Sequence, residues 1–308
     1  MVQTMQVIKK LQQQWPGLEI TIEQIRTTGD RVIDKPLSQI GGDGVFVTEI
    51  EHALHEKRID IAVHSLKDLP TMQPADLRLV IVGPREDVRD VFVSNEPGIQ
   101  LGANMRVGTC SLRRMAQIRA LYPAVQILPI RGNVDTRLRK LDAGEYDCIL
   151  LAAAGLHRLD MQERLAGRIT YLPIEAVMPA PGQGALALEI RDEPALYDEL
   201  LAPLNDPAVQ VATAAERMFM RHLGAGCYLP VAAYGRLHAQ ELTLHGLVIS
   251  LDGQDLVRVQ QSVAWTTAST LEHAEQLGIA VAEQALAQGA MEIIGVLNAN
   301  REQEQQYA

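Results

Sequence analysis

Three polar side chains that could act together, Ser65, Lys67 and Asp68, follow a mostly apolar run that ends near residue 63. The run is rich in β-branched residues and has the length of a buried strand, and Pro70 marks where regular structure must stop. In open α/β sheets, ligands bind beyond the carboxyl ends of the strands. A carboxylate and an ammonium at such a place could hold charged ligands, although the same pair taken alone is more often a solvated loop pair.

Arginines recur after further predicted strands, at residues 106–109, 126–130 and 148–154. Arg113 and Arg114 fall in the first turn of a predicted helix, where a cation is unfavourable next to the helix dipole. We therefore expect them to bind an anion. Residues after equivalent strand ends converge on one cleft in a doubly wound sheet. The arginines expected to line this cleft are Arg113, Arg114, Arg131, Arg137 and Arg158.

Length and composition limit the class of protein. The 308 residues are 47% hydrophobic, which is enough for two or three domains, and they carry a net charge of −10. This charge disfavours a nucleic-acid partner, whereas the excess of basic residues between 106 and 168 points to an anionic small molecule. The sequence has neither an 18-residue apolar run nor the apolar core of a signal peptide, so we expect a cytoplasmic protein without membrane contact.

The remaining pattern predicts alternating helices and strands. We expect a loop at 26–44, where turn formers gather, a hinge at 179–184, and a capping box formed by Ser269 and Glu272. A short helix is predicted to end at 7–11. Further helices are predicted near 46–56, 207–223 and 269–287, and strands at 18–25, 77–82, 185–190, 242–250, 257–263 and 291–297.

The cysteines are Cys110, Cys148 and Cys227. Their odd number and their spacing argue against a disulfide framework and against a zinc site, and no metal is expected. Cys148 lies in a predicted strand and should belong to the core. Cys227 follows the end of a predicted helix, where composition alone favours a small buried residue.

Several long motifs occur in one order along the chain, and together they resemble the porphobilinogen deaminase family, also called hydroxymethylbilane synthases. The motifs are His64-Ser-Leu-Lys-Asp-Leu-Pro70, Gly108-Thr-Cys-Ser-Leu-Arg-Arg114, Arg131-Gly-Asn-Val134, Ala154-Gly-Leu-His-Arg158, Pro179-Ala-Pro-Gly-Gln-Gly184 and Gly226-Cys227. The resemblance covers nearly the whole chain.

The resemblance implies an α/β fold of three domains. Two are doubly wound like type II periplasmic binding proteins, and the third is a smaller α+β domain that carries the cysteine. We expect the first domain at 1–84 with 182–202, the second at 85–181 and the third at 203–308. The implied enzyme is a transferase of tetrapyrrole biosynthesis that joins porphobilinogen units head to tail, with loss of ammonia, into hydroxymethylbilane.

The resemblance also implies a cofactor and a set of site residues. A dipyrromethane would be attached to Cys227 through a thioether, Asp68 would be catalytic, and a monomer would act on porphobilinogen. Residues expected at the cofactor are Lys67, Ser65, Ser111, Arg113 and Arg114. Residues expected at the substrate are Arg131, Arg137, Arg158 and Phe46.

The chain departs from the family pattern in a few places. Asp43 stands where the family has a lysine, and Cys110 and Ala225 replace a serine and a glycine. The family's opening strand is missing, so we expect the working protein to extend upstream by about fifteen residues and the 308-residue form to melt lower. A catalytically impaired homologue and a small-anion binding module of the same fold remain alternatives, and an acidic aldehyde reagent for bound pyrroles would separate them from a primed enzyme.

Overall fold

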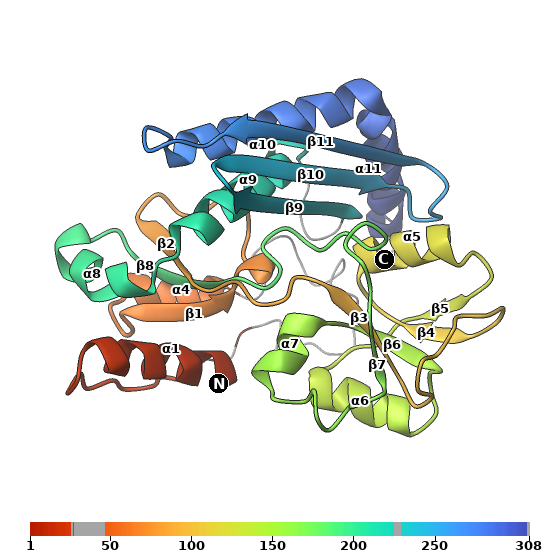
Figure 1. The fold of residues 1–308 in the computed structure, drawn as a ribbon, viewed down its shortest axis with the longest axis horizontal. Coiled ribbons are helices and arrows are strands. Elements are labelled where there is room, and N and C mark those ends of the chain that lie inside the picture. Colours follow the sequence, from red (N-terminus) through yellow and green to blue (C-terminus); the bar gives the residue numbers. More distant parts are fainter. Residues whose placement is uncertain (26, 28–46, 225–228, 307–308) are drawn as a thin grey trace.

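The computed structural model describes residues 1–25, 27, 47–224 and 229–306, with backbone alone from 300 onward. Three β-sheets organise this part of the chain, two in the lower half of Figure 1 and one above them. Most of the predicted loop at 26–44 lies outside the described residues. The same holds for Phe46, Asp43, Ala225 and Cys227.

The first lobe is built on a three-stranded sheet of order β1-β8-β2. Its strands are β1 (Ile61–Ser65), β2 (Leu77–Val82) and β8 (Leu186–Arg191), and β8 runs antiparallel to both neighbours. Helices α1 (Val2–Gln14), α4 (Thr48–His55) and α8 (Pro194–Leu201) cover it. The core forms because Val7 and Leu11 of α1 pack with Leu188 and Ile190 of the central strand.

Two predictions for the start of the chain differ from the structure. The first helix, predicted to end at residues 7–11, continues to Gln14, and residues 18–25 run without strand pairing. Leu18 and Ile20 pack against the core, but Ile22 is 40% exposed. The apolar alternation therefore buries only two side chains, which is too little to hold a strand at a sheet edge.

The second lobe has a five-stranded sheet of order β5-β4-β6-β3-β7. Strand β4 pairs in parallel with β5 and β6, and β3 pairs antiparallel with β6 and β7. The strands are β3 (Asp90–Ser94), β4 (Arg106–Gly108), β5 (Gln126–Leu128), β6 (Cys148–Ala152) and β7 (Ile169–Tyr171). The helices are α5 (Leu112–Leu121), α6 (Val134–Asp142) and α7 (Ala153–Arg158).

The strand predicted through residue 154 ends at Ala152, and α7 follows at once. Arg158 is therefore the last residue of a helix, not a residue just past a strand. Strands β3 and β7 were not predicted. Strand β3 has only three apolar residues, between Asp90 and Ser94, and so short a run does not mark a strand.

The third domain has an antiparallel sheet of order β11-β10-β9, with α9 (Pro207–His222) and α10 (Leu271–Ala285) against it. The strands are β9 (Val231–His238), β10 (Glu241–Ile249) and β11 (Leu256–Ala264). The cap of α10 lies one residue later than predicted, because the Thr270 backbone N–H donates to His273 Nδ1 at 3.1 Å.

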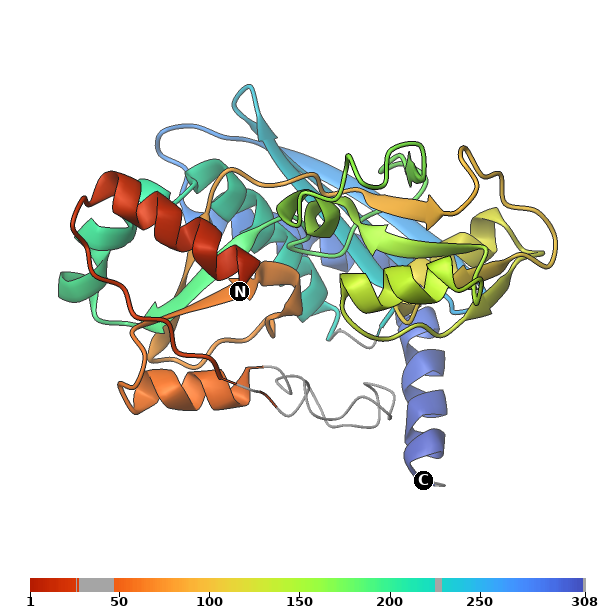
Figure 2. The same ribbon diagram turned by 90° about the horizontal axis from the view of Figure 1, so that it is seen from below.

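The last predicted strand, 291–297, is instead part of helix α11 (Met291–Gln306), which projects from the body in Figure 2. Ile293 and Ile294 are buried against the core of the third domain, with Leu297 packed beside them. That spacing places them on one helical face, and a short apolar run cannot distinguish the two structures by itself.

One helical stretch, Leu271–Ala299, is long and apolar enough to cross a membrane by length and composition alone. In the structure, Leu277, Val281 and Ala285 of this stretch are buried in the third domain. Core helices of globular proteins pass the same test, so the composition is weak evidence for a membrane span.

The fold class expected from the sequence is confirmed: two α/β lobes and a separate third domain. The chain crosses from the first lobe to the second at residues 83–89 and returns at 172–185. Glu216 of α9 binds both crossings, since it forms an ion pair with Arg85 at 2.7 Å and accepts from the Gly182 N–H at 2.6 Å. The third domain is thereby fastened to the junction of the two lobes.

Candidate active site

The turn that carries Lys67 and Asp68 follows β1 directly. It is a single 3₁₀ turn, Leu66–Asp68, in which Leu66 is fully buried and Asp68 is exposed. The turn packs on the returning crossing, because the Leu66 N–H donates to the Ala185 carbonyl at 3.1 Å. Gly182 has a φ of +74°, and a Cβ there would lie 2.9 Å from Leu66 Cγ. The crossing therefore needs glycine to approach this turn.

Arg113 and Arg114 lie in the first turn of α5 as predicted, and the anion they meet is inside the protein. Arg113 Nη1 lies 2.7 Å from Asp90 Oδ2, and Arg114 Nη2 lies 2.6 Å from Asp90 Oδ1. Asp90 is fully buried, and the arginines are 5% and 7% exposed. Although burial alone would raise the pKa of Asp90, the two guanidinium groups hold it well below its usual range.

Arg137 on α6 brings positive charge toward the turn of the first lobe. Its Nε donates to the Gly132 carbonyl at 2.7 Å. Burial lowers the pKa of Arg137, with the positive charges of Arg114 and Arg131 adding to the effect and Asp68 opposing it. The charge of Arg137 therefore interacts with cations of the second lobe and with the carboxylate of Asp68 in the first lobe.

Arg158 also meets both lobes. Its Nη2 donates to the Gly184 carbonyl at 2.7 Å. Burial lowers its pKa, while the carboxylates of Glu86 and Asp68 act in the opposite direction. The structure thus brings Asp68 into electrostatic reach of Lys67, Arg137 and Arg158, which are separated in sequence by up to 91 residues.

The two predicted serines have partners within the protein. Ser65 Oγ accepts from Gln3 Nε2 of α1 at 2.7 Å. Ser111 is the N-cap of α5, and its Oγ accepts from the Arg114 N–H at 3.4 Å. Each hydroxyl keeps capacity for another hydrogen bond.

The cysteines that the structure describes differ sharply. Cys148 is fully buried in β6, and burial raises the pKa of its thiol to about 12. This bears out the expectation that it belongs to the core. Cys110 is exposed, and it lies near enough to Arg137 to interact with its charge.

Sequence reasoning missed two polar residues at this site, Asp90 and Gln183, which are both fully buried. Asp90 is the first residue of an apolar strand. A lone carboxylate at such a place indicates a cation nearby, since buried charges are nearly always paired. Gln183 lies inside the segment predicted as a hinge, and nothing in its spacing marks it.

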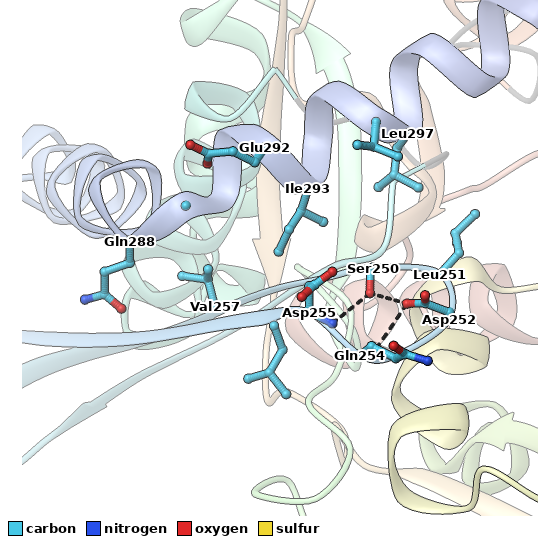
Figure 3. Close-up of a pocket in the computed structure, with 13 residues that line it drawn as sticks. Ser250, Leu251, Asp252, Gln254, Asp255, Val257, Gln288, Glu292, Ile293 and Leu297 are labelled. Carbon is cyan, nitrogen blue, oxygen red and sulfur yellow. Dashed lines mark hydrogen bonds between the residues drawn. The ribbon is translucent and has the colours of Figure 1, made fainter.

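A cavity of about 760 Å³ lies elsewhere, between the β10–β11 turn and α11 (Figure 3). Its polar lining includes Asp252, Asp255 and Glu292, and it contains none of the predicted site residues. Within the described ranges, no group of three or more His, Cys, Asp or Glu side chains is placed to hold a metal ion.

Two models of one protein family match successive parts of this chain. Residues 1–199 match the family model "Porphobilinogen deaminase, dipyromethane cofactor binding domain", and residues 211–287 match "Porphobilinogen deaminase, C-terminal domain". A porphobilinogen deaminase of Chromobacterium violaceum is 46% identical over 94% of this chain and 91% of its own length. That of Syntrophobacter fumaroxidans is 44% identical over 91% of this chain and 88% of its own.

Solved structures with a similar arrangement include binding proteins. A probable amino-acid ABC transporter extracellular-binding protein of Bacillus subtilis aligns with 65% of this chain and 78% of its own, at 12% identity and a TM-score of 0.39. The periplasmic aliphatic sulphonate binding protein of Escherichia coli aligns with 70% of this chain and 64% of its own, at 15% identity and 0.36. TM-scores this low support no conclusion about the function of this chain. The family models and the curated relatives together establish that this chain belongs to the porphobilinogen deaminase family.

Proposed function

We propose that this chain joins porphobilinogen units head to tail, with loss of ammonia, into the linear tetrapyrrole hydroxymethylbilane. The observation that carries the proposal is the match of both family models, which together span most of the chain. The site has the charge that such a substrate requires. Each porphobilinogen carries an acetate and a propionate, and arginine is the side chain best suited to bind carboxylates in pairs of hydrogen bonds.

The dipyrromethane cofactor fits the donor set of this cleft. Arg113 and Arg114 pair with one buried carboxylate, Asp90, and Lys67 lies within electrostatic reach of it, so these groups keep an excess of positive charge for an anionic group. When bound, the cofactor supplies the pyrrole carbon on which the chain grows. We assign Lys67, Ser65, Ser111, Arg113 and Arg114 to its side chains and Cys227 to its attachment.

Asp68 is the residue we assign to the chemistry. Loss of ammonia from the aminomethyl carbon of porphobilinogen breaks a C–N bond and leaves a cationic azafulvene. An exposed carboxylate within electrostatic reach of Lys67, Arg137 and Arg158 can stabilise that cation. It can also accept the proton that the attacking pyrrole carbon loses and then deliver that proton to the amine that leaves in the next round.

Arg131, Arg137 and Arg158 would bind the carboxylates of the incoming substrate, and we keep Phe46 as a further contact. The domain boundaries 1–84 with 182–202, 85–181 and 203–308 are supported by the strands, since each sheet draws its strands from one of these units. We also propose that the enzyme is a cytoplasmic monomer without a nucleic-acid or membrane partner.

The test is a turnover assay with the purified full chain. We expect porphobilinogen consumption, one ammonia released for each unit consumed, and a linear tetrapyrrole of the corresponding mass. The acidic aldehyde reagent should colour the protein before substrate is added, because the bound pyrroles react with it. A folded protein that is uncoloured and consumes no porphobilinogen would overturn the proposal in favour of an inactive homologue.

A further inference from the structure

Gln183 is fully buried at the point where the returning crossing meets the turn of the first lobe. All its polar atoms are used. Nε2 donates to the Val88 carbonyl at 2.7 Å and to Asp90 Oδ1 at 3.0 Å, and Oε1 accepts from Lys67 Nζ at 3.3 Å. One side chain therefore joins the ammonium of the first lobe to the buried carboxylate of the second.

The orientation of this amide follows from the chemistry of its partners. If the amide were turned over, its NH₂ group would face the Lys67 ammonium, which is also a donor, and its oxygen would face the Val88 carbonyl, which is also an acceptor. Both contacts would be repulsive. The arrangement with oxygen toward Lys67 is the one that satisfies all three partners.

The cluster around the amide carries uneven charge. Arg113 and Arg114 already pair with Asp90, and Asp68 is the exposed carboxylate beside Lys67. A neutral amide placed between Lys67 and Asp90 prevents the two charges from pairing directly. The ammonium is held in place, yet its charge is not cancelled by a buried carboxylate.

We propose that Gln183 is a positioning residue for Lys67, a neutral link that holds the ammonium in place apart from Asp90 and leaves its charge for the carboxylates of bound pyrroles. The proposal rests on the proposed function for the identity of those carboxylates. The link between Gln183 and Lys67 itself does not depend on it.

The test replaces the neutral link by a charged one. Gln183→Glu places a carboxylate beside Lys67, and a nearby opposite charge favours the protonated ammonium. In the unchanged protein, burial lowers the pKa of Lys67 to about 8. Acetylation of Lys67, followed by peptide mass spectrometry over a pH series, should therefore show a midpoint near pH 8 that rises by about one unit or more in Gln183→Glu.

The same variant should also carry less covalent dipyrromethane by intact mass, because the new carboxylate competes with those of the cofactor for the ammonium. Gln117→Glu is the matched control. Gln117 is also a buried glutamine, which donates to the Arg113 and Met178 carbonyls and does not contact Lys67. It should lower stability but leave the Lys67 midpoint in place.

Gln183→Met covers the case in which the glutamate variant does not fold. It keeps the size of the side chain but cannot accept from Lys67, so the neutral amine should become more mobile and acetylate faster above its midpoint. An unchanged midpoint in Gln183→Glu, or an unchanged acetylation rate in Gln183→Met, would overturn the proposal. These readouts need no turnover, so they stand even if the unchanged protein consumes no porphobilinogen.

Discussion

Asp68 is exposed, and its carboxylate lies within electrostatic reach of Lys67, Arg137 and Arg158. We predict that Asp68→Asn folds and melts like the unchanged protein, because the change is isosteric and the residue packs against little. Its kcat should fall by about 100-fold or more, the usual cost of losing a preorganised charge at a developing cation. Asp198→Asn removes a surface carboxylate of the same lobe and should keep normal turnover. Near-normal turnover in the Asp68 variant would mean that another group does this chemistry.

Lys67 should impose a pH dependence on how firmly the cofactor's carboxylates are bound. Burial lowers its pKa to about 8, so the side chain is an ammonium below that pH and a neutral amine above it. Binding of the cofactor's carboxylates is therefore strongest well below pH 8 and weakens as the pH rises through it, so turnover should fall in that direction. Lys67→Arg keeps its charge, so its turnover should fall less between pH 7 and 9. If turnover depends on pH equally in the two proteins, Lys67 does not bind the cofactor's carboxylates.

Cys227 is a prediction from sequence alone, since it lies outside the described residues. Cys148 is buried in the core, which leaves it unsuited to carry a cofactor. We expect Cys227→Ser to fold but to lack the covalent dipyrromethane, with intact mass as the readout. Cys110→Ser should keep the covalent mass. A primer still attached in the Cys227 variant would show that another residue holds it.

Among the elements, α6 matters because it delivers Arg137. Its N-cap is Asn133, whose Oδ1 accepts from the Thr136 N–H at 2.9 Å. Removing such a cap costs about 1 kcal/mol and frays the first turn, which includes Arg137. We therefore predict that Asn133→Ala lowers the melting temperature slightly and raises KM more than it lowers kcat.

Thr270→Ala, at the cap of α10, is the control for the α6 variant, because that helix carries none of the proposed site residues. It should lower the melting temperature by a comparable small amount and leave KM unchanged. If both variants raise KM equally, the effect of Asn133 is one of general stability and α6 has no special part in binding.

At the scale of the whole molecule, Glu216 links all three domains. It is fully buried, pairs with Arg85 of one crossing, and accepts from the Gly182 N–H of the other and the Gly235 N–H of β9. Breaking a buried pair by removing one charge costs about 3–5 kcal/mol, because the other charge is left uncompensated. We predict that Glu216→Gln lowers the melting temperature clearly and separates the third domain's transition from the rest in calorimetry.

The surface pair of Arg78 and Asp192 provides the comparison. Arg78→Ala removes the ion pairs of this partly exposed side chain with Asp192 and Asp198, each worth about 0–1 kcal/mol, and should leave a single transition. A Glu216 variant that melts as one unit at an unchanged temperature would show that the third domain is held by apolar packing alone.

The sequence pattern was sufficient to predict those helices and strands whose apolar residues recur with the period of the element that they form. The strand at 77–82 has the bounds that the sequence predicts, and the helices at 207–223 and 269–287 agree closely with α9 and α10. Pattern failed where the apolar run is too short to mark a strand, as in β3, or where a short apolar run suits two structures, as at 291–297. In these cases packing decides, and packing is not visible in a window of a few residues.

The sequence by itself determined the family, the order of the three domains, and the turn with Lys67 and Asp68, because motif residues and strand ends are local features. The partners of those residues were decided only by the tertiary structure. It is the antiparallel placement of β3 beside β6 that puts Asp90 under Arg113 and Arg114, and the returning crossing that inserts Gln183 between Asp90 and Lys67. Contacts between residues more than 90 positions apart depend on how the chain closes on itself, which no local pattern encodes.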